Sequence, residues 1–179
     1  MIIDERDSRK EFMLEVAKQM MTAARTAPKG KGVDIIEIVT LTDEDIDAVS
    51  AELVRLHEET GMKFLLRDSD NIQSADAMLV IGTRHATQGL NCAYCGFKTC
   101  GEKPLSTPCA INTIDVGIAV GSACAKAADL RVDSRVMFSA GWAAERLGLL
   151  PDCHQCIAIP ISASSKNPFF DRKPKEEKK

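Results

Sequence analysis

The sequence predicts a layered α/β or α+β domain, because helix-type and strand-type patterns alternate along it. Some segments repeat apolar residues every three or four positions, while others are short, β-branched and continuous. The chain has 179 residues, 45% of them hydrophobic and 27% charged, which is typical of a globular protein with one substantial core. We expect a single domain over residues 1–179 without internal repeats, with a cysteine-rich segment at 82–110 and an extended tail at 166–179.

Three elements are predicted in the first third of the chain. Apolar side chains keep helical spacing over 9–26, and Pro28 ends the pattern. Residues 33–40 (VDIIEIVT) are short and β-branched, which favours a core strand. Thr42, followed by three acidic residues, opens a second helix, and Gly61 ends it.

The middle of the chain combines a strand with a long irregular segment. Residues 64–66 are predicted to be a short extended piece, and 77–81 (AMLVI) a second core strand. Residues 82–109 are rich in Gly, Thr, Pro and Cys and have no sustained period. A loop of this length is uncommon in a compact domain unless it is functional or held by something other than a hydrophobic core.

The C-terminal part is predicted to contain two helices and two strands. The first helix is apolar nearly all round, so we expect it to be packed closely on several sides. The last strand carries Pro160 near its end, which indicates an edge strand or a bulge. These elements are a helix at 113–130, a strand at 135–138, a helix at 140–147 closed by Gly148, and a strand at 156–161.

The composition argues against several classes of protein. A net charge of −3 and a pI near 5.7 give no basic footprint for nucleic acid. Acidic residues interrupt the start of the chain, so we expect no export signal and a cytoplasmic protein. The apolar segment 111–130 carries Asp115, Lys126 and Asp129, which argues against a membrane span.

Four cysteines are the strongest chemical signal in the sequence. Cys92, Cys95, Cys100 and Cys109 have the spacing C-x2-C-x4-C-x8-C, and such thiolates select zinc, copper(I) or iron–sulfur clusters. A glycine follows Cys95 and another follows Cys100, where a missing Cβ permits positive φ and lets N–H groups turn toward cluster sulfurs. We therefore predict that these four cysteines bind one [4Fe–4S] cluster.

Other uses of the cysteines remain open. The C-x2-C pair at Cys92 and Cys95 could build a structural zinc site together with Cys153 and Cys156, with His154 as a spare ligand. The thiols could also be uncoordinated, and Cys153 and Cys156 alone could be a redox pair. Cys124 is interpreted as a small core residue. Arg84 and His85, at the carboxyl end of a predicted strand, are weaker candidates for lining a pocket.

The run NCAYCGFKTC at 91–100 resembles the 4Fe–4S domain of electron-transfer subunits in anaerobic respiratory and acetyl-CoA pathway complexes. In those domains the last cysteine lies further along the chain than Cys109 does here. Most of the chain, from Arg6 to Arg172, resembles a family of bacterial and archaeal proteins that contain a ferredoxin domain (DUF2148). The cysteine run, PCAINTIDVGIAVGSA from Pro108, AADLRVDSRVMF from Ala127 and IPISASSKNPFFDR from Ile159 carry the likeness. It implies a cluster without naming a reaction.

A fainter resemblance is to the flavin-dependent nitroreductase fold. It is carried by ARTAP at 24–28 and by IAIPIS at 157–162 followed by Arg172. In such enzymes FMN lies at a dimer interface, with basic residues near both chain ends on its phosphate. The resemblance implies a homodimer with possible FMN contacts at Arg6, Arg9 and Arg172, which could equally be solvated surface charges.

The sequence thus favours an electron-transfer protein with an iron–sulfur cluster. It would act on a redox partner protein or a small electron acceptor, either as a carrier or as an FMN-dependent oxidoreductase in which the cluster feeds a flavin. The alternative is a non-catalytic module, stabilised by iron–sulfur or zinc, that binds a protein partner or senses redox state. We expect neither nucleic acid nor a membrane as a partner.

Overall fold

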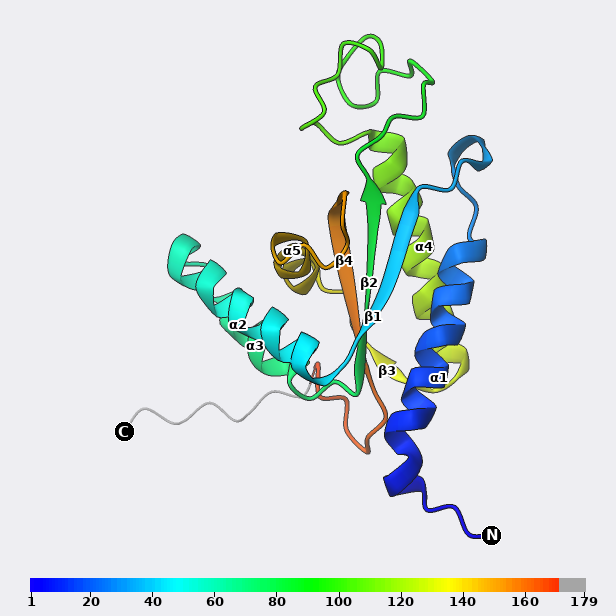
Figure 1. Ribbon diagram of the computed structural model, residues 1–179, viewed down its shortest axis with the longest axis vertical. Helices are drawn as coiled ribbons and strands as arrows, with labels where there is room; N and C mark the ends of the chain where they lie inside the picture. Colours follow the sequence, from blue (N-terminus) through cyan, green and yellow to red (C-terminus); the bar gives the residue numbers. More distant parts are fainter. Residues whose placement is uncertain (171–179) are drawn as a thin grey trace.

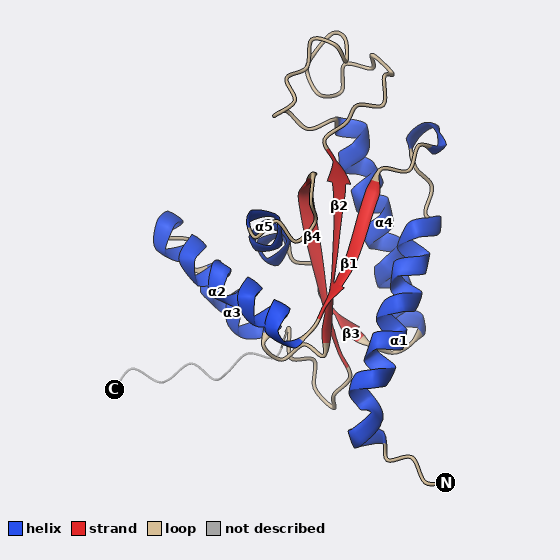
Figure 2. Ribbon diagram, viewed as in Figure 1, coloured by secondary structure: helices blue, strands red, loops and turns tan. Residues whose placement is uncertain are grey.

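A four-stranded antiparallel sheet lies between two layers of helices (Figures 1 and 2). The computed structural model describes residues 1–170, with the strand order β1-β2-β4-β3. Helices α1 and α4 cover one face, and α2, α3 and α5 lie on the other. The strands are β1 (Ile36–Leu41), β2 (Ala77–Arg84), β3 (Asp133–Ser134) and β4 (Cys153–Ser162). The helices are α1 (Glu5–Thr26), α2 (Asp43–Thr60), α3 (Phe64–Ile72), α4 (Ala110–Asp129) and α5 (Phe138–Arg146). This is the layered α+β fold that the sequence predicts.

Strand β2 is buried along nearly its whole length and separates two hydrophobic cores. Val80 pairs with Val39 of β1 and with Ala158 of β4, so both edges of β2 are hydrogen-bonded. Met78 and Val80 enter the core under α2 and α5, whereas Leu79 enters the core under α1 and α4. Each fully buried side chain of this size contributes about 1.5–3 kcal/mol. The continuous apolar run therefore reflects burial on both faces.

Helices α1 and α4 both begin earlier than the apolar periodicity predicts. At α1 the Asp4 side chain accepts a hydrogen bond from the Arg6 N–H at 2.9 Å, so the helix begins at Glu5. Its buried face, with Met13, Ala17 and Met20, packs in the same core as α4. The polar residues before Arg9 are helical because the Asp4 cap satisfies a free N–H group of the first turn. The spacing of apolar residues gives no sign of this cap.

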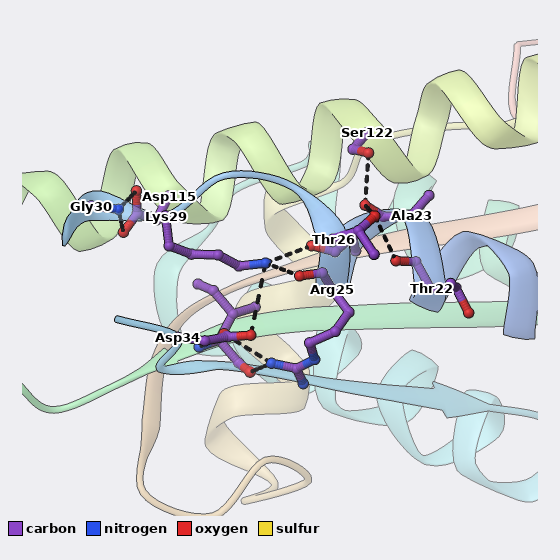
Figure 3. A network of polar contacts seen from close by, with 11 residues as sticks. Thr22, Ala23, Arg25, Thr26, Lys29, Gly30, Asp34, Asp115 and Ser122 are labelled. Atoms are coloured by element: carbon purple, nitrogen blue, oxygen red, sulfur yellow. Dashed lines mark hydrogen bonds and ion pairs between the residues drawn. The ribbon is translucent and has the colours of Figure 1, made fainter. Parts of the chain in front are cut away.

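A network of polar contacts fixes the end of α1 against α4 and β1 (Figure 3). The buried Lys29 ammonium donates to the carbonyls of Ala24, at 3.1 Å, and Arg25. Asp115 accepts the Gly30 N–H, in the short 3-10 helix Gly30–Gly32, with both carboxylate oxygens at 3.0 Å. Ser122 donates to the Ala23 carbonyl at 2.7 Å. A lysine at a helix C-terminus complements the partial negative charge of the last carbonyls, so the network holds α1 in a fixed position along α4.

The segment predicted to be extended at 64–66 is helical instead. Leu65 and Ile72 of α3 are fully buried in the core that also contains α2, which gives the segment an amphipathic helical face too short to recognise by periodicity. Helix α2 ends as predicted, because Gly61 adopts φ 72° and donates its N–H to the His57 carbonyl.

The last strand is longer than predicted and lies inside the sheet. β4 spans Cys153–Ser162 between β2 and β3, so the prediction of an edge at Pro160 is wrong. The Pro160 carbonyl accepts a hydrogen bond from the Arg135 N–H, so the nitrogen of Pro160 also faces the β3 side of the strand. Strand β3 pairs only with Ile161 and Ser162 of β4. A missing N–H is tolerated there because the ladder on that side is short. The strand predicted at 135–138 does not form: β3 covers Asp133–Ser134, just before this range, and only an isolated bridge between Met137 and Ala158 falls within it.

Helix α4 packs on the sheet and on α1, as expected for close packing on several sides, but one of its faces is exposed. Ala119 and Ala123 are buried in the core, whereas Gly117, Ile118 and Gly121 are exposed. Among residues 1–170, no helix has both the length and the apolar character needed to cross a membrane. At the end of the described chain Phe169 is buried, and the rest of the predicted tail, from 171 to 179, lies outside the described residues.

Gly141→Ala tests the direct packing of α5 on β4. A methyl group at Gly141 would overlap the Cys156 carbonyl and lie 2.7 Å from the Cα of Ile157, so we expect a loss of about 3 kcal/mol in unfolding free energy by urea titration. Gln19→Ala is the helical control, because Gln19 is exposed on α1 and its replacement should change the unfolding free energy by less than about 0.5 kcal/mol. Equal stability of the two variants would contradict this packing.

Candidate functional site

The cysteine-rich loop connects the end of β2 to the start of α4 and extends beyond the sheet (Figure 1). It contains no helix or strand, as predicted. Its backbone turns sharply through positive φ at Gly89, Asn91, Ala93 and Gly96. Gly96 thus takes the conformation that the sequence predicts, whereas Gly101 does not, and two residues with side chains turn the chain instead.

A reciprocal pair of hydrogen bonds closes residues 91–100 into a ring. The Asn91 side-chain oxygen accepts the Cys100 N–H at 2.8 Å, and the Asn91 N–H donates to the Cys100 sulfur at 3.4 Å. The ring contains Cys92, which is exposed, and Cys95, which is half-buried. N–H groups directed at sulfur are a common feature of the loops that hold metal clusters.

The spacer at 101–108 is folded on itself between the ring and α4. The buried Lys103 ammonium donates to the carbonyls of Pro104, at 3.0 Å, and Thr107. The Thr107 N–H in turn donates to the Pro104 carbonyl at 3.0 Å. These contacts bring a positive charge under the loop, close to the sulfur at the start of α4.

Cys109 occupies the N-cap position of α4 and is buried. Burial opposes ionisation of its thiol. The N–H groups of Asn112, Gln88 and Ile111, together with the Lys103 ammonium, outweigh that effect and hold the pKa below its ordinary value. None of these groups completes a capping hydrogen bond of normal geometry, so their effect is electrostatic. The position favours an anionic sulfur.

The four predicted ligands fit a cluster in their chemistry, but they do not converge on one point. Across residues 1–170, no three His, Cys, Asp or Glu side chains are gathered as a metal ion needs. The structure joins Cys100 to Asn91 and keeps Cys109 on α4, so ligation by all four requires the ring to close on the helix. The four-cysteine site stays a prediction.

The second C-x2-C pair is part of the protein core. An irregularity in the pairing of β2 with β4, between Ile81 and Thr83, leaves both Cys153 and Cys156 against Gly82. Burial is the main cause that raises the pKa of Cys153 to about 11 and that of Cys156 to about 12. Thiols that stay protonated are poor metal ligands and poor nucleophiles, so their environment favours the packing role over a zinc site or a redox pair.

Two histidines meet beside this pair. The rings of His85 and His154 lie 4.0 Å apart, edge to face, and the Nε2 atom of His154 is buried without a hydrogen-bond partner among the described residues. Burial, with His85 nearby, lowers the pKa of His154. Arg84 is engaged by Glu37, to which its Nε donates at 2.7 Å. Of the two residues predicted at the strand end, His85 therefore contacts a second histidine, and Arg84 forms an ion pair.

The two predicted flavin contacts in the described chain share a pocket at the other end of the molecule. Arg6 and Arg9 line a cavity of about 610 Å³, and Arg172 lies outside the described residues. Sequence reasoning missed Arg131, Ser164 and Ser165, which line the same cavity. The signals available were a basic residue after the helix ending at Asp129 and the serine-rich turn after the last strand.

Comparison with known proteins identifies the family. A protein-family model described as "Uncharacterized protein containing a ferredoxin domain (DUF2148)" matches residues 106–172. A protein of Archaeoglobus fulgidus, described as an uncharacterized protein, is 38% identical over 186 residues, covering 98% of this chain and 100% of that one. The chain belongs to the DUF2148 family. The stretch matched by the family model begins at 106, so it includes Cys109 but not Cys92, Cys95 or Cys100.

Solved structures similar to this DUF2148 protein include several nitroreductases. CinD from Lactococcus lactis, in complex with nicotinic acid, has a TM-score of 0.61 at 14% identity, over 92% of this chain and 81% of that one. A putative nitroreductase with FMN from Desulfovibrio desulfuricans has a TM-score of 0.58 at 14% identity, over 89% and 79%. A nitroreductase with bound FMN from Desulfitobacterium hafniense has a TM-score of 0.56 at 14% identity, over 85% and 78%. The nitroreductase-like fold is thus confirmed, and at these identities the likeness concerns the fold alone.

Thiol labelling tests the division between loop and core cysteines. With iodoacetamide at pH 8, we expect Cys92 in the native, metal-free DUF2148 protein to react, and Cys153 and Cys156 to stay unlabelled until the protein unfolds. A pKa of about 11 leaves about a thousandth of a thiol ionised at pH 8. Peptide mass spectrometry reads each position. Labelling of all three at similar rates in the folded protein would contradict the buried environment of the pair.

Proposed function

We propose that this protein is an iron–sulfur redox protein in which Cys92, Cys95, Cys100 and Cys109 hold a [4Fe–4S] cluster. The main support is the C-x2-C-x4-C-x8-C spacing on a loop in which the Asn91 N–H donates to the Cys100 sulfur and nearby amides lower the pKa of Cys109. Such a cluster supplies one-electron transfer. All seven cysteines are free thiols, which suits a cytoplasmic protein under reducing conditions.

The chain's own residues have definable roles in this proposal. Asn91 keeps the ring closed, so that the cysteines at its base approach one another. Lys103 places a positive charge beside Cys109 and offsets part of the negative charge that four thiolates bring. The N–H groups directed at the sulfurs and the exposure of the ring would set the reduction potential.

A flavin is proposed as the second cofactor, with its phosphate in the arginine pocket. Arg6 and Arg9 lie there as the nitroreductase resemblance implies, in the first turns of α1, where a helix N-terminus also favours an anion. The protein would then be an FMN-dependent oxidoreductase that passes electrons between the flavin, the cluster and a redox partner protein or small acceptor.

A second candidate is a non-catalytic module that the metal stabilises. It is favoured by the position of the ring, whose residues belong to neither hydrophobic core, so a metal would be the main force that orders it. Such a protein would bind a protein partner or sense redox state, and it would not turn over.

Cysteine substitution tests the cluster. Anaerobically purified protein is expected to contain about four irons and four sulfides per chain, and Cys92→Ser, Cys95→Ser, Cys100→Ser and Cys109→Ser should each lose most of them. Cys124→Ser is the control, because burial raises the pKa of that thiol and it lies away from the loop. Wild-type protein without iron, or with zinc in its place, would overturn the cluster. If dithionite does not reversibly reduce the cluster and NAD(P)H supports no turnover, the protein is better described as a non-catalytic module stabilised by the metal.

We also propose a homodimer formed through the exposed face of α4. Ile114 and Ile118 are exposed on it beside Gly117 and Gly121, around which there is open space for a partner helix. The charged residues of α4 are either buried, as Asp115 is, or confined to its last turn. A second copy of the chain would cover this face with the same surface.

Ile118→Glu is expected to convert the dimer to a monomer, because it buries a charge at the centre of the proposed interface. Val54→Glu is the matched control, since Val54 is similarly exposed but lies on α2, in the other helical layer. Sedimentation velocity gives the oligomeric state of each variant. A wild-type monomer, or dissociation by both substitutions alike, would contradict an interface on α4.

A further inference from the structure

Helix α4 ends in a conformation that favours glycine, yet an arginine is present there. The Arg131 N–H donates to the Ala128 carbonyl at 3.1 Å, and the Val132 N–H donates to the Ala127 carbonyl at 3.0 Å. These two bonds define a Schellman motif, whose position after the C-cap residue Leu130 is normally glycine. Arg131 takes φ 59° at that position, which is unfavourable for a residue with a Cβ.

The side chain of Arg131 supplies a reason for its presence at this position. It lines the cavity of about 610 Å³ together with Arg6, Arg9, Ser164 and Ser165. The cavity thus brings together guanidinium groups from α1 and from the turn after α4, and hydroxyl groups from the turn after β4. Strained backbone is often found at binding sites, and here it places a third guanidinium group in the cavity.

The charges in the cavity leave two guanidinium groups available. Arg9 is held by Glu5, with its Nε and NH2 groups 2.7 and 2.8 Å from the two carboxylate oxygens. Within residues 1–170 the side chains of Arg6 and Arg131 have no ion-pair partner and make no hydrogen bond. Asp133, the other carboxylate of the cavity, accepts from the Asn167 amide at 3.1 Å. The cavity therefore has a net positive charge.

The backbone adds to this preference on one side. The cavity includes Glu5 and Arg6, in the first turn of α1, where the N–H groups that Asp4 does not cap carry partial positive charge and favour anions. The C-terminus of α4 has the opposite effect, and the Arg131 guanidinium at that end offsets it. An anion in the cavity would thus have a cationic side chain on each side.

We propose that Arg131 is a phosphate-binding residue which, with Arg6, holds the phosphomonoester end of a ligand in this cavity. A planar guanidinium binds phosphate oxygens in pairs, which explains an arginine rather than a lysine here. The identification of that ligand as FMN rests on the proposed function, whereas the anion site rests on the geometry of the cavity. Arg131 lies outside the set of arginines that the sequence resemblance implies.

Arg131→Gly separates binding from folding. Glycine is favoured at φ 59°, so the urea midpoint of the variant should equal or exceed that of wild type, while its affinity for FMN should fall at least tenfold. The affinity of Arg131→Lys for FMN should fall less, because lysine keeps the positive charge. Riboflavin, which lacks the phosphate, should bind both variants as it binds wild type. Asp152→Gly is the matched control, because Asp152 also has positive φ, at 60°, and is not among the residues lining the cavity.

The outcomes distinguish this proposal from the proposed function. Fluorescence titration with FMN and riboflavin, and calorimetry with inorganic pyrophosphate, measure the binding. Unchanged FMN affinity in Arg131→Gly would overturn the role of Arg131 and leave the flavin proposal intact. Pyrophosphate binding that depends on Arg131, without FMN binding, would support the anion site and remove the flavin. Wild-type protein that binds neither compound would overturn the anion site, while the iron and sulfide measurements on the loop would stand.

Discussion

The burial of β2 on both faces is the constraint on which the rest of the fold depends. Met78 and Val80 pack on one side and Leu79 and Ile81 on the other, so the sheet needs a helical layer on each face. The helices on the two sides therefore belong to separate cores that share the strands of the sheet, including β2 and β4. Residues that leave this double core, at the two ends of the sheet, are not required for packing, and both candidate sites are found among them.

Helix α4 relates the two candidate sites to each other. Its first turn follows Cys109 and its C-terminal cap contains Arg131, so the loop and the cavity lie at opposite ends of one rigid element. Twenty residues at 1.5 Å per residue separate them by about 30 Å. Asp115 and Ser122 tie this helix to Gly30 and to the end of α1 (Figure 3), which keeps Arg6 and Arg131 on the two sides of the same cavity.

The sequence predicts the elements that have a strong period and fails where a local contact decides. Periodicity found α2 and α4, but α3 is too short for it, and the early start of α1 depends on the Asp4 cap. Pro160 indicated an edge strand because sequence alone cannot show that the pairing on its far side is short. Burial of Cys153 and Cys156 likewise depends on long-range packing against Gly82.

In the candidate site, too, the sequence predicts some features and fails to predict others. The cysteine spacing predicts which residues could bind a cluster, because ligand chemistry is local in sequence. The arrangement of the ring, which depends on Asn91 and on positive φ at Ala93, has no comparable signature. Arg6 and Arg9 were indicated by a family likeness, whereas Arg131 was missed, because only the fold brings the end of α4 next to the start of α1.

A separation of about 30 Å along α4 bears on how the proposed cofactors would work together. The phosphate of a flavin in the cavity lies at the far end of the helix from the loop of the same chain. In a two-fold dimer whose axis is perpendicular to α4, the two copies of the helix run antiparallel, and the start of each lies beside the end of the other. The loop at the start of α4 would then lie near the end of α4 in the partner. In the proposed dimer, any electron path between protomers would cross the exposed face of α4, which carries Ile118 and Gly121 and has no charge at its centre.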